Sequence, residues 1–297
     1  MAFTEGYIQE TSAGGWLLRV WQMRVPPFQR PFRAHHHVPF EIVEFTHGNG
    51  IYRTGQASYD IQAGDVFVFA SNEVHCITET GTDGLAYWNL HFEPRYLWGS
   101  RYDSLSPAHQ TFCKGHAETF SNRLPRNHPA TEQIRQLLSE IRTEMESQKS
   151  EYGVMVRGRI MEIAVSLIRE LGYFTEQTET PFSPPRLLAI KAAVDYVLSH
   201  YTESLTLEEV AEAARLTPNY LSTLFHKTMG VSLWDYVTEK RIDRALNLLD
   251  SDQTLTVLHV ALACGFNSTA SFNKAFRLRI GTTPSAYRKL GLGMLEY

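Results

Sequence analysis

Two histidines and a glutamate near the N-terminus are spaced so that their side chains could bind one metal ion or small molecule. His35, His37 and Glu41 form an H-x-H-x3-E pattern, and His75 ends a later pair of expected strands. Imidazole nitrogens and a carboxylate suit divalent zinc, iron, manganese or nickel. The same groups can hydrogen-bond the hydroxyls of a small polar molecule. The residues alone therefore leave three interpretations open: a metal site, an effector site, or satisfied polar residues in a core.

A second set of polar residues lies on segments near the C-terminus that have helical spacing. Side chains of these types can contact base edges or phosphates when a helix lies in the major groove. The alternative is the solvated face of an ordinary amphipathic helix. The candidate DNA-binding residues are Asn219, Ser222, Thr223, His226 and Lys227 in the first segment, Ser268, Thr269, Ala270, Ser271, Asn273 and Lys274 in the second, and Lys240 and Arg241 on a helix between them.

Two successive helix-turn-helix units are expected to position these faces. In the first, Thr206 to Glu209 reads as a capping box, Thr217-Pro218 starts a second helix and Gly230 ends it. The second unit repeats the arrangement from Thr256 to Gly281. A long helix between the units would hold them at a fixed spacing, so that both can enter successive major-groove segments about 34 Å apart. The buried stripe of that helix is predicted to be Trp234, Val237, Ile242, Ala245, Leu246 and Leu249.

The first hundred residues are organised differently, as short apolar and aromatic runs separated by turn residues. Runs of this kind at intervals of roughly 8 to 12 residues predict an antiparallel β-barrel or jelly roll. The fold class is therefore expected to be multidomain, β then α, with helices flanking the barrel and an all-α C-terminal domain. The expected strands are Trp16 to Val25, Phe40 to Thr46, Gly50 to Arg53, Ser58 to Ile61, Val66 to Ala70, Val74 to Thr80 and Leu85 to Phe92.

Five motifs lie in the C-terminal third: Leu205-Thr-Leu-Glu-Glu-Val-Ala211, Tyr220-Leu-Ser-Thr-Leu-Phe225, Arg241-Ile-Asp-Arg-Ala-Leu246, Ser271-Phe-Asn-Lys-Ala-Phe276 and Gly281-Thr-Thr-Pro-Ser-Ala-Tyr-Arg288. Together they make residues 187 to 290 resemble the AraC/XylS family of DNA-binding domains. The resemblance implies seven helices and sequence-specific binding through two reading helices. Neither reading face has an arginine for bidentate guanine contact. By position, the base-reading residues would be Asn219, Ser222, Thr223 and His226, and then Thr269, Ala270, Asn273 and Lys274.

The H-x-H-x3-E run and the segment from Gly64 to His75 resemble the two motifs of the cupin barrel, over about residues 30 to 92. Two departures are present. The glycine expected before the first motif is absent, and Ala70 and Asn72 replace the usual proline and glycine of the second. The resemblance implies that the polar side chains converge inside a barrel.

For a sugar-like effector in such a barrel, Tyr52, Phe69 or Trp88 would stack on the sugar ring while the histidines bond its hydroxyls. The candidate effector-binding residues are His35, His37, Glu41, His75, Trp88 and His91. If the barrel holds a divalent metal instead, the expected ligands are His35, His37, Glu41 and His75.

Two stretches with helical spacing follow the barrel, Ile134 to Met145 and Ile160 to Leu171. They are expected either to mediate dimerisation or to pack on the barrel. A polar, proline-rich tract after them predicts a stiff linker. The expected organisation is an effector-binding barrel in residues 1–125, a helical region in 126–174, a linker in 175–185 and a DNA-binding domain in 186–292.

Charge and composition agree with this organisation. The net charge is −4, and basic and acidic residues are nearly equal in number from residue 186 onward, so positive charge for DNA must be local. The acidic residues Glu239, Asp243, Asp250 and Asp252 would oppose DNA, and the family resemblance allows some of them to face RNA polymerase instead. No apolar run reaches the roughly 18 residues that span a bilayer, and the start lacks a signal pattern, so we expect a cytoplasmic protein without membrane contact.

We therefore expect a one-component transcriptional activator that binds promoter DNA as a homodimer, contacts RNA polymerase, and responds to a small polar effector such as a carbohydrate. One alternative is a metal-binding cupin enzyme or a metal sensor fused to a DNA-binding domain. Catalysis is the less economical account, because the sequence has no phosphate loop, no G-x-S-x-G and no receiver pattern. The other alternative is a ligand-independent regulator whose barrel only dimerises.

Overall fold

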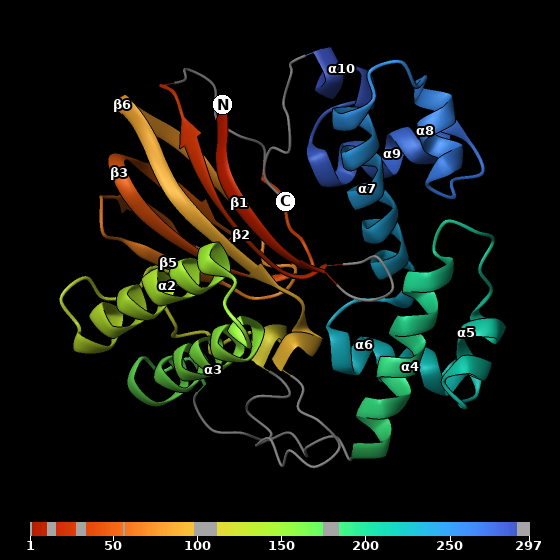
Figure 1. Ribbon diagram of the computed structural model, residues 1–297, viewed down its shortest axis with the longest axis horizontal. Coiled ribbons are helices and arrows are strands. Elements are labelled where there is room, and N and C mark those ends of the chain that lie inside the picture. The colour runs from red at the N-terminus through yellow and green to blue at the C-terminus, as the bar shows by residue number, and fades with distance from the viewer. Residues whose placement is uncertain are drawn as a thin grey trace.

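The computed structural model describes residues 2–10, 16–27, 34–55, 57–97, 112–174 and 184–289. Figure 1 shows a β-sheet domain with two helices beneath it, beside a domain made only of helices. Most of the expected linker, residues 175–183, and the last residues of the expected DNA-binding domain, 290–292, lie outside the described ranges. Within those ranges, none of the helices has the length and apolar character needed to cross a membrane.

The N-terminal domain is built on one antiparallel sheet. Its strand order is β1-β2-β6-β3-β4, and β5 pairs with β3. This arrangement confirms the expected antiparallel β architecture, and it adds a first strand that was not predicted. The strands are β1 (Ala2–Glu10), β2 (Trp16–Val25), β3 (Phe40–Thr54), β4 (Ser58–Ile61), β5 (Val66–Phe69) and β6 (His75–Phe92).

The glycines predicted to separate strands instead lie within two long ones. β3 runs through Gly48 and Gly50, and β6 runs through Gly81 and Gly84. Gly48 has a φ of +85°, and a Cβ added to it would lie 1.9 Å from the carbonyl oxygen of Gly84. The two strands approach too closely there for any side chain, so glycine permits a bend with shifted register where a turn was expected.

The sheet has two buried faces with separate cores. One face carries Phe40, Ile42 and Leu90, which pack against α2 (Pro129–Ser147) and α3 (Tyr152–Glu170). Figure 1 shows these two helices lying side by side along that face. The opposite face holds an aromatic core that includes Phe45 and Tyr87. Packing on the sheet therefore accounts for the apolar stripes of both helices. Short 3₁₀ helices η1 (Pro94–Leu97) and η2 (Phe112–Lys114) follow β6.

Seven α-helices make up the C-terminal domain between residues 184 and 289, the number implied by the resemblance. The predicted capping box at Thr206 and the predicted left-handed Gly230 are both present. Thr217 was expected to cap the helix that starts at Pro218. It occupies the N-cap position, but its side chain makes no capping hydrogen bond to the described residues there. The helices are α4 (Pro184–His200), α5 (Leu207–Ala213), α6 (Pro218–Met229), α7 (Leu233–Ser251), α8 (Val257–Ala263), α9 (Thr269–Ile280) and α10 (Pro284–Lys289).

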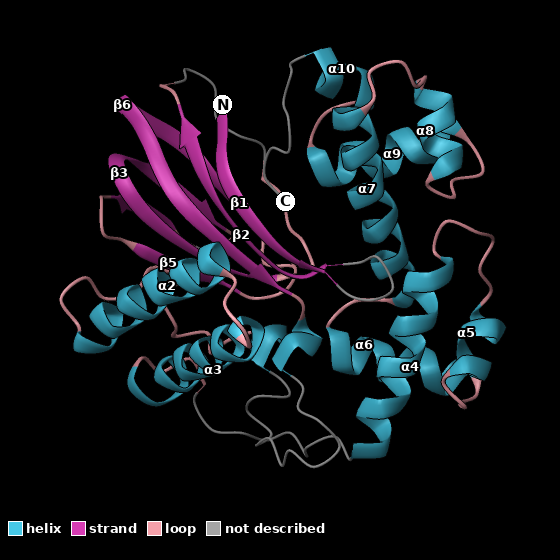
Figure 2. Cartoon of the chain, viewed as in Figure 1, coloured by secondary structure: helices cyan, strands magenta, loops and turns pink. Residues whose placement is uncertain are grey.

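Helix α7 belongs to both cores of this domain. Its first half, including Tyr236 and Val237, packs with α4 to α6, and its second half, including Leu246, packs with α8 to α10. Figure 2 shows it passing from one group of helices to the other. Trp234, predicted to lie in its buried stripe, is 44% exposed. The long helix thus holds the two helix-turn-helix units together, as expected.

Candidate functional site

Four polar side chains converge inside the sheet domain and are called here the histidine cluster: His37, Glu41, His75 and His91. One carboxylate oxygen of Glu41 lies 2.8 Å from Nε2 of His37, 3.0 Å from Nε2 of His75 and 3.3 Å from Nε2 of His91. All four residues are buried. A single carboxylate oxygen is therefore shared by three imidazoles away from solvent.

The strand pairing of β3 with β6 explains this convergence. Glu41 stands opposite His91 in the register, so their side chains leave the same face of the sheet. His75 begins β6, and a bridge to His35 brings it beside the turn that carries His37. Glu41 shares its face with Val43 and Phe45, which places the cluster at one end of the aromatic core.

Backbone carbonyls orient two of the imidazoles. Nδ1 of His37 lies 2.9 Å from the carbonyl oxygen of Pro39, and Nδ1 of His75 lies 2.7 Å from that of Glu73. Because a carbonyl only accepts, Nδ1 must donate in both rings. Nε2 of His37 is hydrogen-bonded to Glu41, whereas Nε2 of His75 lies 3.0 Å from the same oxygen outside hydrogen-bond geometry. The rings can be imidazolium ions that donate to the carboxylate, or neutral rings whose Nε2 lone pairs bind a cation.

Burial and mutual attraction set the charges of the cluster. Burial opposes ionisation of Glu41, but the surrounding imidazoles outweigh it and hold the pKa of this carboxyl well below its usual range. Burial also lowers the pKa of His75, yet attraction to Glu41 more than compensates, and that pKa is raised. For His91 burial prevails and lowers the pKa to about 3. The cluster therefore combines an anionic oxygen with imidazoles of different charge.

Aromatic rings enclose this polar centre. Phe69 stacks on His75 with ring centroids 4.2 Å apart, and Trp21 meets His91 edge-on at 4.5 Å. Tyr52 lies edge-on to His75 at 6.0 Å, so two of the rings expected to stack on a sugar, Tyr52 and Phe69, lie beside the histidines. Buried polar groups within aromatic walls suit a ligand that offers hydroxyls and a ring face.

Of the two remaining expected effector residues, His35 lies at the edge of the cluster and Trp88 lies elsewhere. His35 is half-buried at the rim, where its ring faces those of His37 and His75. Trp88 lies on the opposite face of the sheet, packed against the helix-covered core with Arg142 over its ring at 5.3 Å. The expectation that Trp88 stacks on a ligand beside the histidines is therefore wrong. The aromatic ring beside His91 is that of Trp21, which was not among the predicted effector-binding residues.

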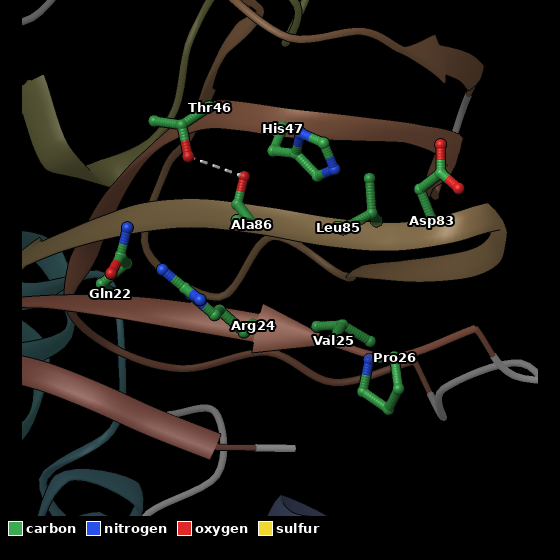
Figure 3. A pocket seen from close by; sticks show the side chains of 9 residues that line it. All are labelled: Gln22, Arg24, Val25, Pro26, Thr46, His47, Asp83, Leu85 and Ala86. Carbon is green, nitrogen blue, oxygen red and sulfur yellow. Dashed lines mark hydrogen bonds between the residues drawn. The ribbon is translucent and has the colours of Figure 1, made fainter.

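An open hollow of about 760 Å³ lies on the sheet domain away from the cluster. Figure 3 shows its side chains arranged along β2, β3 and β6, with the Thr46 hydroxyl donating to the carbonyl oxygen of Ala86 at 3.1 Å. Its polar side chains, among them Arg24, His47 and Asp83, are exposed to solvent. A ligand there would contact well-solvated groups, whereas the histidine cluster offers buried polar groups within aromatic walls.

The two expected reading faces are exposed. On α6, Asn219, Ser222, Thr223, His226 and Lys227 are all open to solvent. The hydroxyl of Thr223 donates to the carbonyl oxygen of Asn219 at 3.1 Å, which leaves its oxygen lone pairs available. On α9, Thr269 is half-exposed, and the helix N-cap Ser268 accepts from the backbone N–H of Ser271 at 3.1 Å. The other residues of this face, Ala270, Ser271, Asn273 and Lys274, are exposed like Ser268.

The two candidate phosphate-binding residues of α7, Lys240 and Arg241, are engaged by other protein groups in this structure. Lys240 is 4% exposed, and its ammonium lies 2.7 Å from the carboxylate of Glu93 in the sheet domain. The guanidinium of Arg241 donates to the carbonyl oxygens of Tyr201 at 2.6 Å and Glu203 at 2.9 Å. The expectation for Lys240 fails because its partner comes from the other domain.

Comparisons with known proteins agree with both halves of this description. A family model described as an AraC-like ligand binding domain matches residues 28–164, and one described as a helix-turn-helix domain matches residues 210–290. The melibiose operon regulatory protein of Escherichia coli (strain K12) is 26% identical over 268 residues, which cover 86% of this chain and 83% of that protein. The HTH-type transcriptional activator RhaS of Escherichia coli O1:K1 / APEC is 23% identical, covering 90% and 91% of the two chains.

The fold is also similar to that of a solved structure. The crystal structure of unsaturated fatty acid bound wild-type ToxT from Vibrio cholerae strain SCE256 has a TM-score of 0.57 and 15% identity, covering 100% of both chains. The sheet domain with its buried cluster and the exposed pair of reading helices therefore correspond to two domains that occur together in known regulators. The chain belongs to the AraC family of DNA-binding transcriptional regulators, with an AraC-like ligand-binding domain ahead of its helix-turn-helix domain.

Proposed function

We propose that this regulator is a transcriptional activator whose histidine cluster binds a small polar effector, a carbohydrate. One observation carries the proposal: a carboxylate and three imidazoles are buried together between aromatic rings. Buried polar groups need partners, and sugar hydroxyls can both donate to Glu41 and accept from the imidazoles. The ring of a sugar has apolar faces that suit Phe69 and Trp21.

The relatives' names support this effector class. One regulates a melibiose operon and another is named as a transcriptional activator, and each aligns with more than four-fifths of this chain. ToxT shares the fold and holds an unsaturated fatty acid, so the fold by itself does not select a sugar. The choice of a polar effector here depends on the cluster, since a fatty acyl chain would leave Glu41 and the imidazoles without new partners.

On the DNA side, α6 and α9 are proposed to read bases through the exposed faces described above, with two successive major-groove contacts per chain.

We propose a homodimer, supported by the exposed apolar side chains of Val154 and Met155 on α3. RNA polymerase is a proposed partner, and the exposed side of the helical domain is available to it. Glu239 is excluded from that contact, because it is buried against the sheet domain. As for most DNA-binding regulators, the proposed place of action is the cytoplasm, and no catalytic step is proposed.

A metal is the second candidate ligand, and the orientation of the imidazoles favours it. With Nδ1 of His37 and of His75 donating to carbonyl oxygens, both Nε2 atoms lie within 3.0 Å of Glu41, as in metal sites whose histidines donate their other ring nitrogen to a carbonyl. The ligand atoms of His37, Glu41 and His91 lie within 4.8 Å of one another, as do those of His35, His37 and His75. A divalent ion such as zinc, nickel, iron or manganese fits this donor set.

Thermal melting of the full chain tests the effector proposal. The protein is melted with and without EDTA against a panel of mono- and disaccharides, sugar acids and divalent metals. A ligand at 100 times its Kd stabilises by about 2.7 kcal/mol, which should raise Tm by about 5 °C. A sugar-specific shift supports the carbohydrate, a shift with metal alone supports the second candidate, and no shift at all favours a barrel used only for assembly.

A matched pair of variants locates any shift. Glu41→Gln alters the cluster, whereas Glu44→Gln alters a carboxylate three residues further along the same strand. Glu44 pairs with Arg142 on the helix-covered face of the sheet. The ligand-induced shift should be lost in Glu41→Gln and kept in Glu44→Gln. A shift that survives Glu41→Gln would exclude the cluster as the binding site.

A further inference from the structure

Charged side chains are buried where the two domains meet. Glu93 of the sheet domain and Glu239, Lys240 and Arg279 of the helical domain are each at most 6% exposed. Val38 completes this seam, because its side chain lies in the core formed by α4 to α7 although it belongs to the sheet domain. The seam is defined here as these five residues. Burying so many charges costs desolvation, so their partners and geometry must be well defined.

One path leads from the histidine cluster to the second reading helix. The residue after His37 is Val38, whose backbone N–H donates to both carboxylate oxygens of Glu239, at 3.1 and 3.3 Å. The same carboxylate accepts from the guanidinium of Arg279 at 3.0 Å. Arg279 lies in α9, six residues after Asn273. One carboxylate thus joins a neighbour of the cluster to the helix that is proposed to read bases.

A second path runs parallel to the first. Two residues after His91, the carboxylate of Glu93 lies 2.7 Å from the ammonium of Lys240 and 3.1 Å from the hydroxyl of Tyr236. Glu239 and Lys240 are consecutive residues of α7. The chain segments that follow His37 and His91 therefore both contact the same turn of α7, the helix that holds the two reading units together.

The seam is closely packed where the first path crosses it. The cavity lined by His37, Pro39, Glu239 and Arg279 has a volume of about 10 Å³, roughly the space of one water molecule. Closely packed interiors do not deform gradually, so a shift of the His37 segment must either move Glu239 or break its bond to Val38. A buried carboxylate without a partner is costly in free energy. We therefore expect Glu239 to move with Val38 and Arg279 to rearrange with it.

We infer that Glu239 is the positioning residue that transmits the state of the histidine cluster to α9. An occupant of the cluster that engages Glu41 releases His37 from its 2.8 Å contact, and the Val38 N–H moves with it. Glu239 and Arg279 then shift together, which changes the placement of α9 relative to α6. This coupling rests on the proposed effector site, and it makes the spacing of the two reading helices the regulated quantity.

Hydrogen–deuterium exchange of the full chain tests this role without an effector. Glu41→Gln perturbs the cluster, and the measured quantity is the change it causes in the exchange rate of α9 amides. The change is compared in three backgrounds: wild type, Glu239→Gln and Asp235→Asn. Asp235 is the matched control, because it is an α7 carboxylate 3.7 Å from Arg279, but its side chain is 61% exposed. Amides of α5 serve as the internal reference.

We expect Glu41→Gln to change the exchange of α9 at least threefold in the wild-type and Asp235→Asn backgrounds, and less than 1.5-fold with Glu239→Gln. A purely structural role for Glu239 would alter the starting rate and leave the response to Glu41→Gln intact, which would overturn the inference. No α9 response in the wild-type background would also overturn it. If Glu239→Gln does not fold, Arg279→Gln breaks the same path from the α9 side and should abolish the response.

The outcome is independent of the effector test. An α9 response that vanishes with Glu239→Gln supports the coupling even when no sugar shifts the melting temperature. Suppose instead that a sugar shifts the melting temperature, but Glu41→Gln changes α9 exchange equally in all three backgrounds. The effector site would then be supported, and Glu239 would have no role in transmitting its state.

Discussion

Replacing Lys240 with methionine removes the cation that is buried between the domains. The ammonium loses its place 2.7 Å from Glu93, whose carboxylate keeps the guanidinium of Arg95 at 2.6 Å and the hydroxyl of Tyr236. Burial lowers the pKa of Lys240, but attraction to Glu93 outweighs it and raises the pKa, so the deleted group is a cation. Burial likewise opposes the charge of Glu93, yet Lys240 and Arg95 lower the pKa of that carboxyl.

The magnitude follows from what Glu93 retains. Removing one partner of a buried ion pair costs about 3 to 5 kcal/mol when the other charge is left unpaired. Glu93 keeps two donors, and methionine refills most of the volume, so we expect a loss of about 2 to 3 kcal/mol of unfolding free energy. In a protein of this size that corresponds to a fall in Tm of roughly 5 °C.

Differential scanning calorimetry of the full chain is the assay. Because the seam couples the domains, Lys240→Met should also separate one melting transition into two, as the domains unfold independently. Lys191→Met is the control: that ammonium is 62% exposed and 3.6 Å from Asp195, and its loss should cost under about 0.5 kcal/mol. Glu93→Gln combined with Lys240→Met should cost less than the sum of the single changes.

A wild-type melting profile for Lys240→Met would refute this reasoning. It would mean that the buried pair contributes nothing to holding the domains together. DNA binding supplies an independent check, because a lysine that is buried against Glu93 releases no counterions from phosphate. The slope of log affinity against log salt should then be the same for Lys240→Met and wild type, and a slope lower by about 1 would return Lys240 to the phosphate contacts.

On α9, Lys274→Ala should weaken binding to DNA selected with the wild-type protein by about 1 to 3 kcal/mol in gel shifts, and unchanged affinity would remove it from the base contacts. On α6, Lys227→Ala should weaken all sequences alike and lower the salt slope by about 1; an unaltered slope would contradict a phosphate contact. Burial lowers the pKa of His116, but its bond to Glu73 raises it overall, so its stabilisation is present below about pH 6.5 and is lost as pH rises through the raised value. The fall in Tm caused by His116→Gln should therefore be larger at about pH 6 than at about pH 9, and an equal fall at both would show that the imidazolium contributes nothing. Gly48→Ala should destabilise by at least about 3 kcal/mol in urea melts because its Cβ would meet a carbonyl oxygen, whereas Gly55→Ala, whose Cβ would meet no described atom within 4 Å, should be nearly neutral.

Features that depend on neighbouring residues could be predicted from the sequence. The capping box at Thr206, the terminating Gly230 and the strand at Ser58–Ile61 are each encoded within a few residues. The convergence of Glu41 with His37 and His75 could be anticipated from strand spacing and from the resemblance to a known barrel. Local signals of this kind can be read from the sequence because they agree with the final fold.

Features that depend on distant partners could not be predicted in this way. The local sequence predicts that Lys240 is exposed. It is buried because it pairs with Glu93, which belongs to the other domain. Trp88 was a different kind of error, one that alternation could have prevented. Trp88 and His91 are three residues apart on one strand, so their side chains leave opposite faces of the sheet. Both residues lie on one expected strand, Leu85 to Phe92, so the relation could be read from the sequence.

The bond between Val38 and Glu239 also bears on the order of events during synthesis, because the two residues are 201 positions apart. A ribosome that adds about 5 to 20 residues per second needs roughly 10 to 40 seconds to pass from one to the other. Until the helical domain has been made, the sheet domain must present the apolar side chain of Val38 to water, and Glu93 has Arg95 but not Lys240 as a partner. The nascent sheet domain is therefore a natural substrate for chaperones, and a fragment that stops before α7 should aggregate more readily than the complete chain.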